Sequence, residues 1–222
     1  VSVNSIFSPI ISQLSTQQKT EELGVQYQNT SRYIFILSFP LVVFILLFRE
    51  NILGLFGDDF VVGSGLLVLV MLAEVINFAF GSVSMMLKMA GYEKQMKYLS
   101  VFSSVAAFSL VALCLPQHGF IAVGYGYILG RLLLNLGGAL ILRNKTGIFV
   151  FNKKYLSTIT FYLGLSLAVF FGYNGLALEL GNGYAFILFL LAIYLVFIFL
   201  WYVFYGRKEV PKIISLLKNK NV

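Results

Sequence analysis

The chain has 222 residues, of which 59% are hydrophobic and only 11% are charged, and its formal net charge is +7. An ordinary soluble domain carries roughly 25% charged residues, so this composition excludes most soluble enzymes, disordered chains and disulfide scaffolds. The lone Cys114 and the lone His118 argue against a metal site built on such residues. We expect a membrane protein without a metal or other cofactor, and we interpret the positive charge as a topology signal rather than a nucleic-acid surface.

The chain begins with a moderately apolar segment, residues 1–14, which a polar segment, residues 15–32, follows. Residue 1 is valine, and the segment lacks the charged region followed by an apolar core that a signal peptide has. We expect residues 1–14 to be the end of a preceding transmembrane helix and residues 15–32 to be a cytoplasmic loop. The chain would then be a C-terminal piece of a longer protein. The alternative is an N-terminal helix that lies in the membrane interface.

Six apolar runs follow, each close to the roughly 20 residues that a membrane-spanning helix needs. They lack the alternation of polar and apolar residues that strands of a membrane barrel show. His118 falls in the short turn between the third run and the fourth. We predict an all-α integral membrane protein with a six-helix bundle over residues 33–205, whose helices cover 33–53, 65–86, 99–115, 120–142, 157–176 and 184–205.

The basic residues gather on one side of these predicted helices. If each predicted helix crosses the membrane once, successive connections lie on alternate sides. Fourteen of the 16 Lys and Arg then fall on one side, whereas the connections on the opposite side hold only Arg49. Cytoplasmic loops carry the excess of Lys and Arg in membrane proteins. The crowded side is therefore predicted to be cytoplasmic, and residues 206–222 form a cytoplasmic basic tail.

Two charged residues lie inside predicted helices. Glu74 and Arg131 are each about ten residues from the outer end of their helix, which is roughly 15 Å at 1.5 Å per residue. Their similar depth predicts that they pair or face one aqueous cavity. A charge at this depth costs a few kcal/mol or more, so it marks a functional site by default. The alternative is a structural pair that fixes the register of the helices.

Each charge belongs to a polar face with helical spacing. The second helix carries Glu74, Asn77, Gly81, Ser84 and Lys88. The fourth helix carries Gly124, Tyr127, Arg131, Asn135 and Gly138. From these faces we take six candidates for a substrate cavity: Arg131, Glu74, Asn77, Asn135, Tyr127 and Lys88. Small residues predict close helix contacts nearby: Gly126 and Gly130 on the fourth helix, and Ser100, Ser103, Ser104 and Ala107 on the third.

The order of segments resembles a known family. FPLVVFILLFRENILGLFGDDF is followed by the glycine-containing turn LKMAGYEKQMKYLS and then by LCLPQHGFIAVGYGYILGRLL. This succession resembles the C-terminal half of bacterial polysaccharide flippases of the O-antigen type, in the superfamily that also holds the MATE drug exporters and the lipid II flippases. The resemblance covers nearly the whole chain. It departs from the family pattern at Phe120 and Tyr125–Tyr127, where small residues dominate in the family.

The resemblance implies a transporter of roughly 12 to 14 helices, with two six-helix bundles around a central cavity. It would not be an enzyme, and it would lie in the bacterial inner membrane with a cytoplasmic C-terminus. Its substrate would be an undecaprenyl-diphosphate-linked oligosaccharide for O-antigen, lipopolysaccharide or capsule, moved to the outer leaflet by alternating access. The other partners would be membrane lipids and the missing N-terminal half.

The candidate residues suit such a substrate. The guanidinium of Arg131 matches phosphate oxygens, Lys88 would assist entry at the cytoplasmic mouth, and the two asparagines and Tyr127 would bind sugar hydroxyls. Glu74 would neutralise Arg131 between cycles or couple to an ion. Alternatives are a MATE-type drug or cation exporter, a lipid II flippase and a membrane-embedded polysaccharide polymerase or ligase. The polymerase would need a large outer loop, and the longest outer connection here is roughly residues 49–64.

Overall fold

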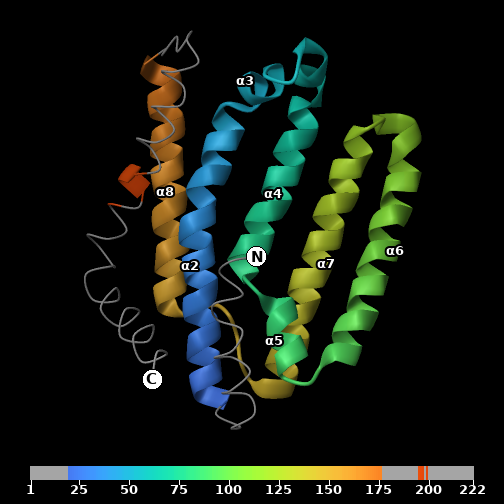
Figure 1. The fold of residues 1–222 in the computed structure, drawn as a ribbon, viewed down its shortest axis with the longest axis vertical. Coiled ribbons are helices and arrows are strands. Elements are labelled where there is room, and N and C mark those ends of the chain that lie inside the picture. Colours follow the sequence, from blue (N-terminus) through green and yellow to red (C-terminus); the bar gives the residue numbers. More distant parts are fainter. Residues whose placement is uncertain (1–19, 177–194, 198, 200–222) are drawn as a thin grey trace. The chain divides into compact units, whose positions relative to one another are not determined.

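The computed structural model describes residues 20–176, 195–197 and 199 (Figure 1). These residues are mainly helical and contain no strand, which confirms the all-α prediction. Four helical stretches in the described part are long and apolar enough to cross a membrane. The segments 1–14 and 206–222 and most of the sixth predicted helix lie outside the described residues. The elements are α2 (Thr20–Leu47), α3 (Arg49–Gly54), η1 (Asp58–Gly63), α4 (Ser64–Phe80), α5 (Val83–Met89), α6 (Glu93–His118), α7 (Ile121–Thr146) and α8 (Lys153–Leu176).

The first described helix, α2, begins at Thr20 rather than at residue 33, so the prediction of a loop over residues 15–32 is wrong from Thr20 onward. Two acidic residues in its first turn complement the positive end of the helix dipole. Contacts distant in sequence also hold this segment, since the Gln28 side chain donates to the Phe149 carbonyl at 2.7 Å. Arg32, which we expected in the loop, is only 2% exposed, and its guanidinium lies 5.6 Å from the centre of the Tyr33 ring.

The first predicted membrane helix also ends earlier than expected. α2 stops at Leu47, and the short helix α3 carries the residues up to Gly54. Arg49 and Glu50 form an exposed ion pair of 3.3 Å at the start of α3. Charged groups of this kind belong at the membrane surface, which explains why the apolar helix ends before them.

The second predicted membrane helix is broken at Gly81. α4 ends at Phe80, and α5 begins at Val83. Gly81 has φ +60°, and a Cβ atom at this position would lie 2.8 Å from the Cα of Ser31 in α2. Both the backbone conformation and the close approach of α2 require glycine. The polar face predicted from Glu74 to Lys88 is therefore divided between two helices.

The break frees carbonyl groups at the end of α4, and two buried tyrosines bind them. The Tyr27 hydroxyl donates to the Phe80 carbonyl at 2.8 Å, and the Tyr155 hydroxyl donates to the Ala79 carbonyl at 2.8 Å. Both tyrosines are at most 1% exposed. Helix ends without such partners are costly in apolar surroundings, so these hydroxyls make the break tolerable.

The helices α6 and α7 are both longer than predicted. α6 continues through Pro116 to His118, so His118 lies in the last helical turn and not in a loop. The prolyl ring is accommodated near the C-terminal end of the helix, and the turn to α7 is limited to Gly119 and Phe120.

Helix α7 lies between α4 and α6 (Figure 1). Its buried residues are mostly small, which lets neighbouring helices come close. At Gly126, a Cβ atom would lie 2.8 Å from the carbonyl oxygen of Ala107 in α6. The close packing predicted at Gly126–Gly130 and the contact predicted for the small face of the third helix are therefore both confirmed, and the structure shows that these two surfaces pack against each other. The chain divides after Leu167, and the site described below lies wholly in the first unit, Val1–Leu167.

Candidate functional site

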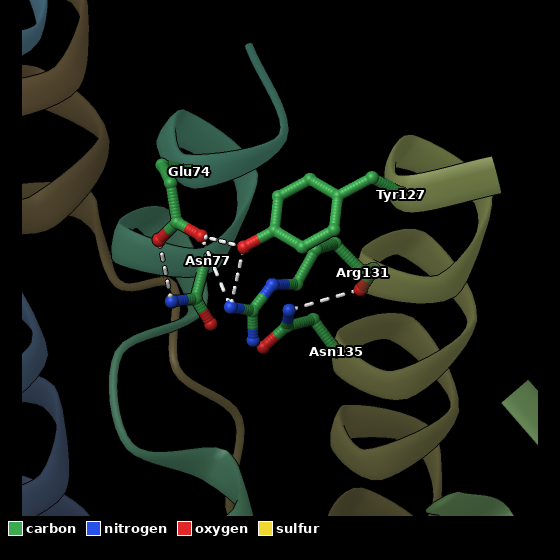
Figure 2. A network of polar contacts seen from close by, with 5 residues as sticks. All are labelled: Glu74, Asn77, Tyr127, Arg131 and Asn135. Carbon is green, nitrogen blue, oxygen red and sulfur yellow. Dashed lines mark hydrogen bonds and ion pairs between the residues drawn. The ribbon is translucent and has the colours of Figure 1, made fainter. Parts of the chain in front are cut away.

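A polar network joins α4 to α7 (Figure 2). The Glu74 carboxylate accepts a hydrogen bond from Arg131 Nη2 at 3.0 Å and another from the Tyr127 hydroxyl. Arg131 Nη2 also donates to the Tyr127 oxygen at 2.7 Å, and the guanidinium lies 5.0 Å from the centre of that ring. The two charges that we expected at a similar depth are thus in direct contact.

The second carboxylate oxygen of Glu74 accepts a hydrogen bond from the Asn77 side chain at 3.0 Å. Glu74 and Asn77 are three residues apart on α4, and Tyr127 and Arg131 are four apart on α7. Helical periodicity therefore places each pair on one face, and the packing of α4 against α7 brings the faces together. Every side-chain hydrogen bond described in this network involves either the charged carboxylate or the charged guanidinium. Hydrogen bonds to a charged group are about twice as strong as those between neutral groups.

The network is accessible and incomplete. The side chains of Arg131 and Glu74 are 30% and 18% exposed. The Nε atom of Arg131 is buried and has no hydrogen-bond partner among the described residues. A guanidinium carries five N–H donors in a fixed fork, so Arg131 retains donor capacity beyond what Glu74 and Tyr127 use. The exposed part of the Arg131 side chain can therefore receive the oxygens of an anionic group, whereas Nε is closed off in this conformation.

Two other candidates do not share the side-chain hydrogen bonds of Glu74, although Asn135 lies directly beside Arg131 (Figure 2). Asn135 is 2% exposed, and its amide donates to the backbone carbonyl of Arg131 at 2.9 Å, so it supports its own helix. Lys88 lies on α5 beyond the break at Gly81, where its side chain is exposed. Because α4 and α5 do not share one helical face, Lys88 is not aligned with Glu74 as the sequence spacing had suggested.

An open cleft of about 450 Å³ runs between α6 and α7, and Arg131 and Tyr127 form part of its wall. Residues of the small face that we predicted on the third helix form the opposite wall. Arg131 and Tyr127 therefore both contact Glu74 of α4 and also border the cleft between α6 and α7. The residues that line the cleft are Ser100, Ser103, Ser104, Ala107, Phe108, Val111, Val123, Gly126, Tyr127, Gly130, Arg131 and Leu134.

Sequence reasoning missed several buried polar groups. Arg32 was assigned to a loop, and neither Tyr27 nor Tyr155 was singled out. Tyr27 stands in the polar segment 15–32 and Tyr155 directly follows two lysines, so no local signal distinguishes these two as buried groups. Among the described residues, no group of three or more His, Cys, Asp or Glu side chains is arranged to hold a metal ion.

A family model described as MatE matches residues 1–113, half of the chain. The chain belongs to the MatE family. MatE proteins are membrane transporters, and the apolar helices agree with a multi-pass membrane protein. The match includes Glu74 and ends within α6, so Tyr127 and Arg131 lie beyond it. Searches among curated proteins and among solved structures gave no match.

Proposed function

We propose that this MatE protein translocates a lipid-linked oligosaccharide across the membrane by alternating access, as part of a transporter that contains a second helical bundle. The observation that supports this proposal is the partly exposed Arg131 side chain, which lies on a membrane-crossing helix and borders the cleft between α6 and α7. A lipid-linked sugar diphosphate is anionic, and a guanidinium matches phosphate oxygens in geometry and charge.

Glu74 has a defined part in this scheme. In the structure it neutralises Arg131, which lowers the cost of the cation while no substrate is bound. An incoming diphosphate would first meet the donors of Arg131 that Glu74 leaves unused. Asn77 and Tyr127 hold the carboxylate in place, so Arg131 is presented in one orientation rather than as a freely moving side chain.

The principal rival is a MATE-type exporter of cationic drugs. Such a transporter would bind its cargo through an acidic group in the membrane. Glu74 already has a cation in contact, since Arg131 lies 3.0 Å away. A cationic cargo would have to displace this tethered guanidinium, which makes the anionic cargo the better fit to the site.

Replacement of Arg131 in the full-length transporter tests the proposal. We expect Arg131→Gln to slow translocation at least about tenfold, because one charge-assisted contact to phosphate contributes about 1.5–3 kcal/mol. The measurement is accumulation of lipid-linked oligosaccharide on the cytoplasmic leaflet in cells that depend on this transporter. Protein level and the elution profile of the purified variant show that it is folded.

The matched control is Arg143→Gln, which removes the same charge from an exposed position near the end of the same helix. Translocation by this variant should equal that of the unmodified protein. Normal translocation by Arg131→Gln would contradict the proposal. Increased export of a cationic dye by Arg131→Gln, without any effect on the oligosaccharide, would instead support the drug exporter, because the change frees Glu74.

A further inference from the structure

The cleft between α6 and α7 has two chemically different ends. Gly130 of α7 faces the Ser103 carbonyl and Ala107 of α6, and Gly126 faces Ala107 and Val111. The two helices are connected by a tight turn and run in opposite directions, so Ser103 is level with Arg131. Moving along the cleft toward the turn, the wall changes from serines to Phe108, Val111 and Val123.

The end near Arg131 carries unused hydrogen-bond donors. Ser103 is 3% exposed, and its hydroxyl has no hydrogen-bond partner within the part of the chain that the structure describes. The same holds for Nε of Arg131. Both atoms are closed off in this conformation, so the acceptor oxygens of a ligand would reach them after rotation of the Ser103 or Arg131 side chain. Such contacts would offset the cost of about 1–3 kcal/mol that a buried polar group without a partner carries.

The other end offers only apolar contact. Phe108 is 76% exposed and Val123 is 48% exposed, and both lie on the cleft wall. The helix α6 has a mostly unburied apolar surface around them, as is usual for a helix that faces lipid. A ligand chain that follows this end of the cleft can therefore continue directly into the bilayer.

We infer that the α6–α7 cleft binds the first isoprene units of a polyprenyl diphosphate, with the diphosphate oxygens at Arg131 and Ser103 and the chain along Phe108, Val111 and Val123. This inference rests on the proposed function, and it assigns the path of the lipid chain, which that proposal leaves open. The cleft volume of about 450 Å³ accommodates a short part of such a chain, while the remaining isoprene units stay in the membrane.

The occupant follows from the combination of the two ends. A soluble sugar phosphate would leave the apolar end without contacts. A neutral lipid chain would leave the donors of Ser103 and Arg131 unsatisfied. An anionic group joined directly to an apolar chain satisfies both ends, and a polyprenyl diphosphate has this form.

Photocrosslinking tests the assignment in the full-length transporter, reconstituted in phosphatidylethanolamine nanodiscs. The probe is farnesyl diphosphate with a diazirine on its third isoprene unit. Mass spectrometry should locate the label in residues 108–111 and at Val123, and unlabelled undecaprenyl diphosphate should compete for it. Ser104→Phe fills the cleft from an exposed wall position and should reduce labelling about tenfold, the loss expected when two methylene groups lose their contact.

The matched control is Val105→Phe, which adds the same ring at the next residue of α6, outside the cleft wall. Its labelling should be unchanged. Labelling at other helices, no labelling of the chain, or equal labelling of the Ser104 variant would overturn the inference. Equal competition by phosphatidylglycerol would also overturn it, because an ordinary lipid would then occupy the cleft. In each of these cases, translocation that still depends on Arg131 would leave the proposed function intact. Failure of the inference can therefore be distinguished from failure of the proposed function.

Discussion

The junction between α4 and α5 and the network between α4 and α7 both hold polar groups among apolar helices, but they do so differently. At the junction, the neutral hydroxyls of Tyr27 and Tyr155 bind carbonyl oxygens, and both tyrosines are at most 1% exposed. In the network, the charged side chains of Glu74 and Arg131 are 18% and 30% exposed, and Arg131 Nε has no partner among the described residues.

This difference separates a structural solution from a functional one. A junction that serves only the fold should be neutral and closed to water, because a charge in apolar surroundings costs much free energy. The junction also holds one donor that is unmet among the described residues, the buried Ser31 hydroxyl beside Gly81, so an unused donor alone does not mark a binding site. A binding site needs charge, access and a donor that is not yet used. The network has these three properties, and variants of the two regions should therefore affect different quantities.

The largest effect is expected at the junction itself. Gly81→Ala places a methyl group within 2.8 Å of the Ser31 Cα and forces alanine to adopt φ +60°. Strain and overpacking together should cost about 3 kcal/mol or more, so little folded protein should be recovered in gel filtration of detergent extracts. Gly91→Ala is the control, because Gly91 also has positive φ, +83°, but has no atom within 4 Å of the added methyl group. This control should cost about 1 kcal/mol, and equal loss in both variants would contradict the steric explanation.

A smaller effect is expected when the network loses one charge. Arg131→Met leaves Glu74 without its cation, and since both side chains are partly exposed we expect a loss of about 1–2 kcal/mol in the free energy of unfolding. The double variant Glu74→Met, Arg131→Met removes the unpaired acid and should recover most of that stability without recovering translocation. Thermal unfolding and the translocation assay measure the two quantities separately. A double variant as unstable as the single one would show that packing, rather than charge, dominates here.

The smallest effect is expected from one junction hydroxyl. Tyr155→Phe removes the donor to the Ala79 carbonyl and should lower the free energy of unfolding by about 1 kcal/mol. Translocation by the folded protein should stay normal. Tyr125→Phe is the control, because the hydroxyl of Tyr125 has no hydrogen bond within the described residues, and its stability should be unchanged. Slower translocation by the Tyr155 variant would show that the junction takes part in function.

The features that sequence could predict are those set by helical geometry alone. A fixed rise per residue gave Glu74 and Arg131 a similar depth, and fixed angular spacing placed Tyr127 and Arg131 on one face. Glycine and serine spacing likewise predicted that α7 and α6 each have a surface for close helix packing, although it did not predict that these two surfaces contact each other. None of these inferences required knowledge of a distant part of the chain.

The features that sequence could not predict depend on distant contacts. Gln28 binds a carbonyl 121 residues later, and this contact helps the polar segment after Thr20 to be helical. The break at Gly81 reflects the approach of Ser31, whereas hydropathy averaged over a window does not respond to one glycine. The bond that the Asn135 amide makes to the Arg131 carbonyl within its own helix was likewise not foreseen, because an asparagine on a helix face can bind either its own backbone or a neighbour.

The central place of α7 has a mechanical consequence. Its surface contacts α4, α5 and α6, and at Gly126 its backbone approaches that of α6 too closely for an added methyl group. A helix held by three neighbours at such short range cannot slide or tilt alone without steric overlap. We therefore expect any opening and closing motion in which Arg131 takes part to carry α7 together with α4, α5 and α6, and to place the deformation at segments outside this group.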